Sequence, residues 1–254
     1  MILVTGASGF LGSHIARRLD AQGTATRLLV RASSNRSSLE GLTRATFAVG
    51  DVRDPGSLRR AAEGVTGVIH AAGLVKARDP RDFARVNTEG TQAVLEAVAD
   101  VAPDLRRFVL VSSLAAHGPS PDGRPRPVAA PARPVTAYGR SKWSAEQAAT
   151  SAAGRVPVTI VRPPMIYGPG DREVLAFFRA VRWRLVPLTG PPQSLLSAIF
   201  VEDCADACIA ALAGDLPSGS CFFVDDGQPE PLIARLRDIE RAVGRPALAT
   251  VRVP

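Results

Sequence analysis

The first twelve residues constrain the fold of this chain more than any other stretch. Residues 1–4 are apolar and, with Thr5, predict a short buried strand, and the next apolar residues recur at helical spacing. Between strand and helix the chain reads Gly6-Ala7-Ser8-Gly9-Phe10-Leu11-Gly12. In such a turn the first glycine permits a tight bend, the second lets backbone approach a pyrophosphate, and the third lets helix pack on strand. We therefore predict a dinucleotide site formed by Gly6, Ser8, Gly9, Phe10, Leu11 and Gly12.

Strand and helix patterns alternate over much of the remaining chain. Further apolar strands are predicted at residues 26–30, 45–49, 67–70, 105–111 and 156–161. This alternation predicts an α/β fold with a doubly wound parallel sheet of the Rossmann type. We expect a dinucleotide-binding domain over residues 1–165. A small substrate-binding region over residues 166–254 is expected to be interleaved with it.

The end of the second strand bears on the choice of cofactor. A unit that prefers NAD usually has an acid there for the ribose 2′-hydroxyl, whereas arginine suits the 2′-phosphate of NADP. Here Arg31 holds that position, Arg36 follows, and no acid occurs before Glu40. We predict NADP, with NAD as the other possibility. The alternative for Arg31 is a solvated loop arginine.

The ends of the next two strands also carry predicted cofactor contacts. Asp51 and Val52 follow the strand at 45–49, and the carboxylate can accept a hydrogen bond from an adenine amino group. Ala71, Ala72 and Gly73 follow the strand at 67–70. Their small side chains would let a flat cofactor lie against the backbone.

A serine, a tyrosine and a lysine form the predicted catalytic group. Ser113 follows the strand at 105–111, at the edge where open α/β sheets bind ligands. Tyr138 begins a predicted helix, and Lys142 lies one turn further on the same face. A phenol has a pKa of about 10, and a nearby ammonium lowers it. The three groups could move a proton at a C–O centre while hydride moves at its carbon.

Composition favours this interpretation over a chance Tyr-x-x-x-Lys on a helix. The chain has two lysines, Lys76 and Lys142, against 29 arginines, and two tyrosines, Tyr138 and Tyr167. Arginine is larger and effectively never loses its proton, so it substitutes poorly in a proton relay.

Charge and cysteine content argue against several other classes of protein. The formal charge of +7 comes from scattered arginines, so we predict no nucleic-acid partner. Cys204, Cys208 and Cys221 lack zinc-ligand spacing, so we predict no metal site and interpret them as small core residues in a reducing compartment. Because neither a signal sequence nor a bilayer-spanning apolar stretch is evident, we expect a cytoplasmic protein without a membrane partner.

In their order along the chain, these motifs closely resemble the extended short-chain dehydrogenase/reductase family. The likeness covers residues 1–225 and is nearest to the 3β-hydroxysteroid dehydrogenase and dihydroflavonol reductase branch. The motifs are the glycine turn, Asp51, Ala71-Ala72-Gly73, Asn87 on a helix predicted at 82–100, Ser113, Tyr138-x-x-x-Lys142 and Arg162-Pro163-Pro164.

The resemblance implies a role for each matching residue. Tyr138 would be the catalytic acid/base, Lys142 would lower its pKa and hold the nicotinamide ribose, and Ser113 would polarise the substrate oxygen. Asn87 would position Lys142 through water. Pro163 and Ile166 would pass beside the nicotinamide and so belong to the cofactor contacts. The helices of Asn87 and Tyr138 would pair two copies into a homodimer.

Two departures from the family pattern bear on the substrate. Nucleotide-sugar epimerases of this family commonly carry an Arg-Asp-Tyr-like run where this chain has Leu196-Ser197-Ala198. The missing cation argues against a nucleotide sugar, and Leu195, Leu196 and Phe200 favour a less charged molecule. The chain is also shorter than most members, so part of the C-terminal substrate region is expected to be missing.

These observations predict an NADP-dependent oxidoreductase. It would transfer hydride between nicotinamide and an apolar ketone or secondary alcohol of steroid, flavonoid or polyketide type. The alternatives are a nucleotide-sugar epimerase or dehydratase with tightly bound NAD, and a non-catalytic dinucleotide-sensing protein. Substrate specificity is expected to depend on the proline-rich loop at 118–135 and on the region after Gly170.

Overall fold

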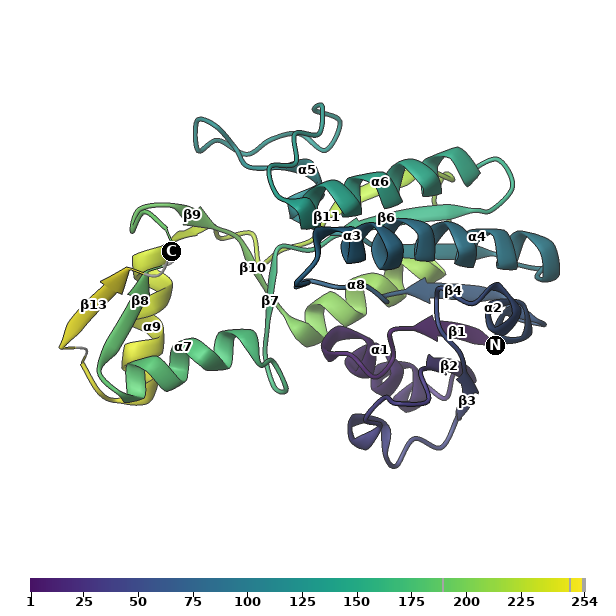
Figure 1. The fold of residues 1–254 in the computed structure, drawn as a ribbon, viewed down its shortest axis with the longest axis horizontal. Coiled ribbons are helices and arrows are strands. Elements are labelled where there is room, and N and C mark those ends of the chain that lie inside the picture. Colours follow the sequence, from purple (N-terminus) through teal and green to yellow (C-terminus); the bar gives the residue numbers. More distant parts are fainter. Residues whose placement is uncertain (189, 247, 253–254) are drawn as a thin grey trace. The chain divides into compact units, whose positions relative to one another are not determined.

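Seven parallel strands form the centre of the first of two units into which the chain packs (Figure 1). The sheet unit comprises Met1–Pro163 and Glu202–Val224, and the small unit comprises Pro164–Val201 and Asp225–Pro254. The computed structural model describes residues 1–188, 190–246 and 248–252.

The strand order of the large sheet is β11-β6-β5-β4-β1-β2-β3. The strands are β1 (Ile2–Thr5), β2 (Thr26–Val30), β3 (Ala45–Val49), β4 (Gly67–His70), β5 (Arg107–Val111), β6 (Val158–Arg162) and β11 (Ser220–Phe223). β1 lies between β2 and β4, with Val4 level with Leu28 on one side and Ile69 on the other. From β1 the chain adds β2 and β3 on one side, and it then crosses back to add β4, β5 and β6 on the other side of β1. This order confirms the predicted doubly wound fold.

Helices cover both faces of the sheet, as a parallel sheet requires (Figure 1). Helices α2 (Pro55–Ala62), α4 (Gly90–Val101) and α6 (Ala137–Ala152) form one layer. Helices α1 (Phe10–Ala21) and α8 (Val201–Ala213) lie on the other face, where Arg18 and Asp206 form an ion pair. β4, β5 and β6 are buried along their whole length, which explains their nearly continuous apolar sequences.

The helix predicted at 82–100 is divided into three parts. It consists of α3 (Pro80–Phe83), a π-helical stretch η2 (Ala84–Glu89) and α4. Asn87 lies within the π-helical stretch, a feature that often marks functional sites. After β5 a short helix, α5 (Leu114–His117), precedes the predicted loop, and the described residues 118–136 form neither helix nor strand.

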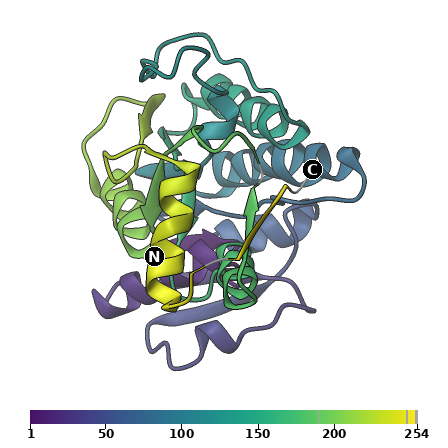
Figure 2. The same ribbon diagram turned by 90° about the vertical axis from the view of Figure 1, so that its left-hand side faces the viewer.

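In the described residues of the small unit there are three short strand pairs and two helices. β7 (Met165–Tyr167) pairs with β10 (Ala198–Phe200), β9 (Leu195–Leu196) with β12 (Glu230–Pro231), and β8 (Leu185–Leu188) with β13 (Ala249–Arg252). Helix α7 (Glu173–Arg182) packs against α9 (Leu232–Val243), which Figure 2 shows along its length in yellow. Their shared core contains Val181, Val186, Leu188, Leu232 and Leu236.

A 3₁₀ turn, η1 (Ser37–Leu39), follows β2.

The structure also describes the cysteines and the lengths of the helices, on which two further predictions depend. Cys204 and Cys208 are buried in α8 and Cys221 is half-buried in β11, and all three are free. Within residues 1–188, 190–246 and 248–252, none of the helices combines the length and apolar character needed to cross a membrane.

The turn between β1 and α1 has no room for side chains at two of its glycines. Gly6 adopts a φ of +69°, and a Cβ there would lie 2.6 Å from the Ala72 nitrogen. A Cβ on Gly12 would lie 2.1 Å from the Gly6 carbonyl oxygen. The helix therefore approaches the turn as closely as backbone atoms allow.

We predict that Gly12→Ala destabilises the protein, because the added methyl group would force α1 away from the turn. The free energy of unfolding, measured by denaturant titration, should fall by about 1–3 kcal/mol, the usual cost of overpacking. Gly154→Ala is the matched control, since no atom lies within 4 Å of the position of its Cβ. Equal stability of the two variants would contradict the prediction.

Candidate active site

The predicted phosphate-binding turn follows β1 and lies against Ala71 and Ala72, directly after β4. Gly9 caps α1 without a side chain, so no side-chain oxygen satisfies the first N–H groups of the helix. The Gly9 nitrogen donates to the Gly6 oxygen at 2.9 Å and closes the turn. Ser8 is half-buried, Leu11 is buried, and the Phe10 ring packs edge-on against His14. Free N–H groups and the positive end of the helix dipole suit a pyrophosphate.

The residues predicted to select the cofactor follow β2. Arg31 is exposed directly after the strand, whereas the Arg36 guanidinium lies over the Phe47 ring at 5.3 Å from its centroid. A guanidinium stacked on an aromatic face is held in place without losing its charge. Both arginines lie on the sheet unit at the edge that carries the glycine turn.

Asp51 already has a protein partner. The Arg53 guanidinium donates to both carboxylate oxygens at 2.9 Å, and this holds the pKa of Asp51 below its ordinary value. Val52 is buried in the core, close to Gly90. Contact of Asp51 with adenine stays a prediction, and it would have to be made beside this ion pair.

Asn87 connects the segment after β4 to α6. Its Oδ1 accepts from the Leu74 nitrogen at 2.7 Å, and its Nδ2 donates to the Leu74 oxygen at 3.0 Å and to Ser141 Oγ at 2.9 Å. A Cβ on Gly73 would lie 3.1 Å from Asn87 Oδ1 and 3.9 Å from Lys142 Nζ. Asn87 thus fixes the neighbours of Lys142 directly. A water link to Lys142 itself stays a prediction.

A close contact between α5 and α6 brings Ser113 and Tyr138 together. Ser113 caps α5 by accepting from the Ala115 nitrogen at 3.1 Å. At the start of α6, Thr136 Oγ1 accepts from the Gly139 nitrogen at 2.9 Å. A Cβ on Gly139 would lie 2.4 Å from the Ala115 oxygen, so only glycine lets the two helices meet here. Tyr138, in that first turn, shares a hydrogen bond with Ser113.

The pKa of Tyr138 differs from the expectation. Burial raises it above its ordinary value, and the hydrogen bond with Ser113 only partly opposes this. Tyr138 is half-buried, whereas Lys142 is buried and its Nζ donates to the Val111 oxygen at 2.7 Å. The four-residue spacing of Tyr138 and Lys142 predicted a lowered phenol pKa. The structure gives a raised pKa, because the phenol is removed from water and the Lys142 ammonium donates its hydrogen bond to a strand carbonyl. Burial lowers the pKa of Lys142 to about 8, and the charge of Glu146 opposes that shift.

A buried histidine beside Lys142 was not predicted. His70, the last residue of β4, pairs through Nδ1 with Thr5 Oγ1 at 2.6 Å and through Nε2 with Thr91 Oγ1 at 3.0 Å. Burial, and then the charge of Lys142, lower its pKa to about 3. The sequence signal that could have indicated this buried histidine was its position at the end of an apolar strand. His70 is therefore a neutral link between β1, β4 and α4.

The sequence interpretation also missed Glu146. It lies one turn beyond Lys142 on the face that carries Tyr138, and it forms a buried ion pair with Arg162. The repeated spacing of four residues in Tyr138, Lys142 and Glu146 was the available signal.

The two remaining predicted cofactor contacts belong to different units. The Pro163 oxygen accepts from the Leu114 nitrogen at 2.8 Å in the sheet unit. Ile166 lies on β7 of the small unit, level with Ile199 of β10. The rings of Tyr167 and Phe200 meet on this strand pair at 5.7 Å.

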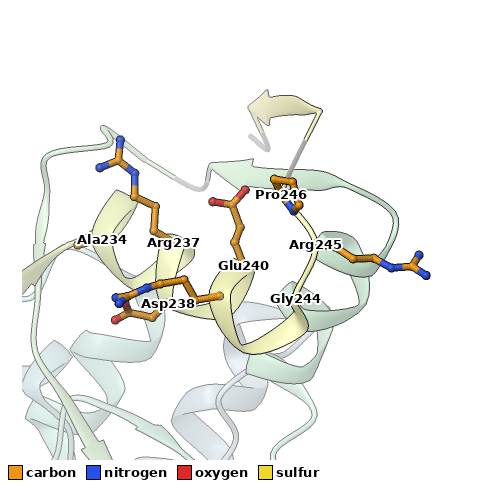
Figure 3. Close-up of a pocket in the computed structure, with 8 residues that line it drawn as sticks. Ala234, Arg237, Asp238, Glu240, Gly244, Arg245 and Pro246 are labelled. Atoms are coloured by element: carbon orange, nitrogen blue, oxygen red, sulfur yellow. The ribbon is translucent and has the colours of Figure 1, made fainter.

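A surface hollow of about 670 Å³ lies along α9 of the small unit (Figure 3). Arg237 and Glu240 extend from the helix, while Arg245 points away from them. The described residues that line it include no individually predicted catalytic or cofactor-binding residue, but they lie within the region 166–254 that is predicted to bind substrate. In the described ranges no three His, Cys, Asp or Glu side chains lie close enough to hold a metal ion.

We predict that His70 makes stability depend on pH. In the folded protein its pKa is about 3 against an ordinary value of 6.5, so the unfolded chain binds the extra proton. The stabilisation is complete above pH 6.5 and is lost as the pH falls towards 3, at up to about 1.4 kcal/mol per pH unit.

Denaturant unfolding between pH 7 and 4 tests this against His70→Gln, which keeps a polar side chain but cannot titrate. The other titrating groups are common to both proteins, so the difference between their slopes reports His70. Parallel slopes would show that His70 is not held neutral.

The chain is similar in sequence to a known protein family and to several of its members. Residues 2–220 match the NAD dependent epimerase/dehydratase family. The chain is 38% identical over 211 residues to ceramide reductase of Caulobacter vibrioides, covering 83% of this chain and 60% of that protein. It is 32% identical over 240 residues to the 4-hydroxy-2-methyl-3-oxo-4-farnesyl-3,4-dihydroquinoline-1-oxide ketoreductase of Stigmatella aurantiaca, covering 90% and 69% respectively. The chain thus spans about 60% of the length of the first relative.

A solved structure agrees at the level of the fold. The dTDP-glucose 4,6-dehydratase DesIV from Streptomyces venezuelae superposes with a TM-score of 0.90 at 24% identity, covering 100% of this chain and 84% of that one. The predicted resemblance to the extended short-chain dehydrogenase/reductases, which are NAD(P)-dependent enzymes, is confirmed. The chain belongs to the NAD dependent epimerase/dehydratase family.

Proposed function

We propose that this protein is an NADP-dependent oxidoreductase that transfers hydride between nicotinamide and the carbon of an apolar ketone or secondary alcohol. The observation that carries the proposal is the meeting of Tyr138 with Ser113 beside the buried Lys142. All three lie on the sheet unit that bears the glycine turn.

The side chains of the site are suited to proton transfer at the substrate oxygen. When bound, the nicotinamide cofactor supplies or accepts the hydride. In reduction, Ser113 would orient the carbonyl oxygen, and Tyr138 would give it the proton that completes the alcohol and later regain one from solvent. The raised pKa means that the phenol is protonated at neutral pH and so is available as the acid, although it also makes the phenol a weaker proton donor. Lys142, with a pKa of about 8, is mostly charged there and can favour the transient phenolate.

The cofactor preference is supported by Arg31 and Arg36. Arg31 is exposed at the strand end where a 2′-phosphate would lie, and Arg36 is held by Phe47. Residues 6–12 fit a dinucleotide, because the uncapped start of α1 leaves N–H groups for the pyrophosphate.

The apolar substrate class is supported from two sides. Leu195, Leu196 and Phe200 on the small unit lack the cation that a sugar-nucleotide diphosphate would need. The two relatives described above are named as reductases, one of ceramide and one of a farnesyl-bearing quinoline oxide. Steroid, flavonoid and polyketide ketones belong to the same chemical class.

The proposal extends to the location and assembly of the protein. The free cysteines of α8 and β11 are compatible with a reducing, cytoplasmic compartment. Helices α4 and α6 pack side by side in one layer, and with η2 they offer the face through which a homodimer would form.

The name of the matching family, NAD dependent epimerase/dehydratase, favours one alternative to an oxidoreductase. A nucleotide-sugar epimerase or dehydratase would keep NAD tightly bound and show no net redox change. Cofactor that survives purification, with conversion that needs no added NADPH, would support that function. A non-catalytic dinucleotide-sensing protein is the third candidate, and the presence of both Tyr138 and Lys142 argues against it.

We predict that Tyr138→Phe lowers kcat by about 10²- to 10⁴-fold, because the proton donor is lost. NADPH should still bind with its wild-type Kd, since the phenol hydroxyl faces Ser113. Calorimetry and a panel of apolar ketones provide the two readouts. Unaltered turnover would exclude Tyr138 as the acid.

We predict that the wild-type protein binds NADPH more tightly than NADH, and that Arg31→Asp abolishes the preference. A charge-assisted hydrogen bond contributes about 1.5–3 kcal/mol, so NADPH affinity should fall roughly tenfold to hundredfold while NADH affinity is retained. Arg155→Asp, an exposed charge reversal after α6, is the control. A wild-type preference for NADH would make Arg31 a solvated loop residue and favour the epimerase.

A further inference from the structure

A buried ion pair lies behind the predicted catalytic residues. Arg162 donates to Glu146 through Nε at 2.9 Å and through Nη2 at 2.7 Å. The exposed fraction of the Arg162 side chain is 6% and that of Glu146 is 2%. Removing two charges from water is costly, and the gain in stability over an apolar pair is often nil. A buried pair of this kind therefore calls for an explanation other than stability.

The pair joins the elements that carry the predicted catalytic residues. Ser112, at the end of β5 and next to Ser113, donates to Glu146 Oε1. On the other side, Arg162 Nη1 donates to His117 Nδ1 at 3.1 Å, and His117 ends the short helix that Ser113 caps. The same Nη1 donates to the Val128 oxygen at 3.4 Å in the loop at 118–135. One ion pair thus holds β5, α5, α6, β6 and the loop together.

We propose that Glu146 and Arg162 are positioning residues, which fix the α6 face that carries Tyr138 and Lys142 against the strand end that carries Ser113. The inference rests on the proposed function, because positioning matters only if those three residues act together. Neither residue needs to touch substrate or cofactor. Glu146 stands on the same helical face as Tyr138 and Lys142 at successive steps of four residues.

The charge of Glu146 also acts on Lys142. The other titratable or charged side chains facing these two residues are His70 on β4, His117 on α5, Arg162 on β6 and Cys221 on β11. His70 is neutral, since its pKa is about 3. Glu146 is the group that opposes the effect of burial on the Lys142 pKa. Without its charge, Lys142 would release its proton at a lower pH.

The scarcity of lysine makes this directly measurable. Isotope-labelled lysine gives NMR signals from Lys76 and Lys142 alone, and Lys76→Arg assigns them. The Lys142 Nζ signal should titrate near pH 8 in the wild type and about one pH unit lower in Glu146→Gln. Glu146→Asp, which keeps the charge, should restore the midpoint. Asp100→Asn, which breaks an exposed ion pair with Arg59, should leave it unchanged.

Turnover provides the second readout. In Glu146→Gln, kcat for a ketone should fall at least about tenfold, and the alkaline limb of its pH profile should move to lower pH with the Lys142 midpoint. The circular dichroism spectrum serves as the folding control. A folded Glu146→Gln variant whose Lys142 midpoint and pH limb match the wild type would overturn the proposal, because a purely structural pair would move neither.

The lysine titration needs no substrate, so it separates this proposal from the proposed function. If the wild type turned over no ketone but the Lys142 midpoint still moved in Glu146→Gln, the proposed function would fail and the link between Glu146 and Lys142 would stand. If Glu146→Gln did not fold, Ser112→Ala would remove one hydrogen bond to the same carboxylate and keep the ion pair. A several-fold loss of kcat at unchanged NADPH affinity is then expected, and wild-type kcat would overturn the proposal.

Discussion

The close backbone contact between the β1 turn and the end of β4 is the constraint on which the rest of the sheet unit depends. Gly6 can lie against Ala71 and Ala72 only because it has no side chain and adopts a positive φ. In the strand order, the connections after β1 and β4 lead to opposite sides of the sheet, and ligands of open α/β sheets bind at such a point. The strand order and the local contact therefore specify the same place for the cofactor.

The predicted catalytic residues depend on a second backbone contact, between α5 and α6. Gly139 lets the first turn of α6 approach the Ala115 carbonyl, and this brings Tyr138 to Ser113. Two further links hold α6 in register: Lys142 donates to the Val111 carbonyl, and Asn87 donates to Ser141. Packing between helices and strands thus brings the predicted catalytic groups together.

Burial is the main electrostatic influence in this region. It raises the pKa of Tyr138 and lowers those of His70 and Lys142, in each case because the charged form loses its hydration. The Glu146–Arg162 pair is buried, and its carboxylate opposes the effect of burial on the Lys142 pKa. A phenol that stays protonated at neutral pH, next to an ammonium that is mostly charged, agrees with the proposed carbonyl reduction.

The sequence by itself determined the elements and the order of the motifs. Apolar strands alternating with amphipathic helices specify a parallel α/β sheet, because only covered faces tolerate strands such as β4, β5 and β6. Local spacing and position at a strand end were enough to predict the glycine turn, Ser113, Tyr138 and Lys142. The tertiary structure alone decided which distant groups meet: Lys142 with the Val111 carbonyl, Asn87 with Ser141, and Glu146 with Arg162. It also decided the direction of the Tyr138 pKa, since burial and contacts between distant segments have no signature in the local periodicity of a sequence.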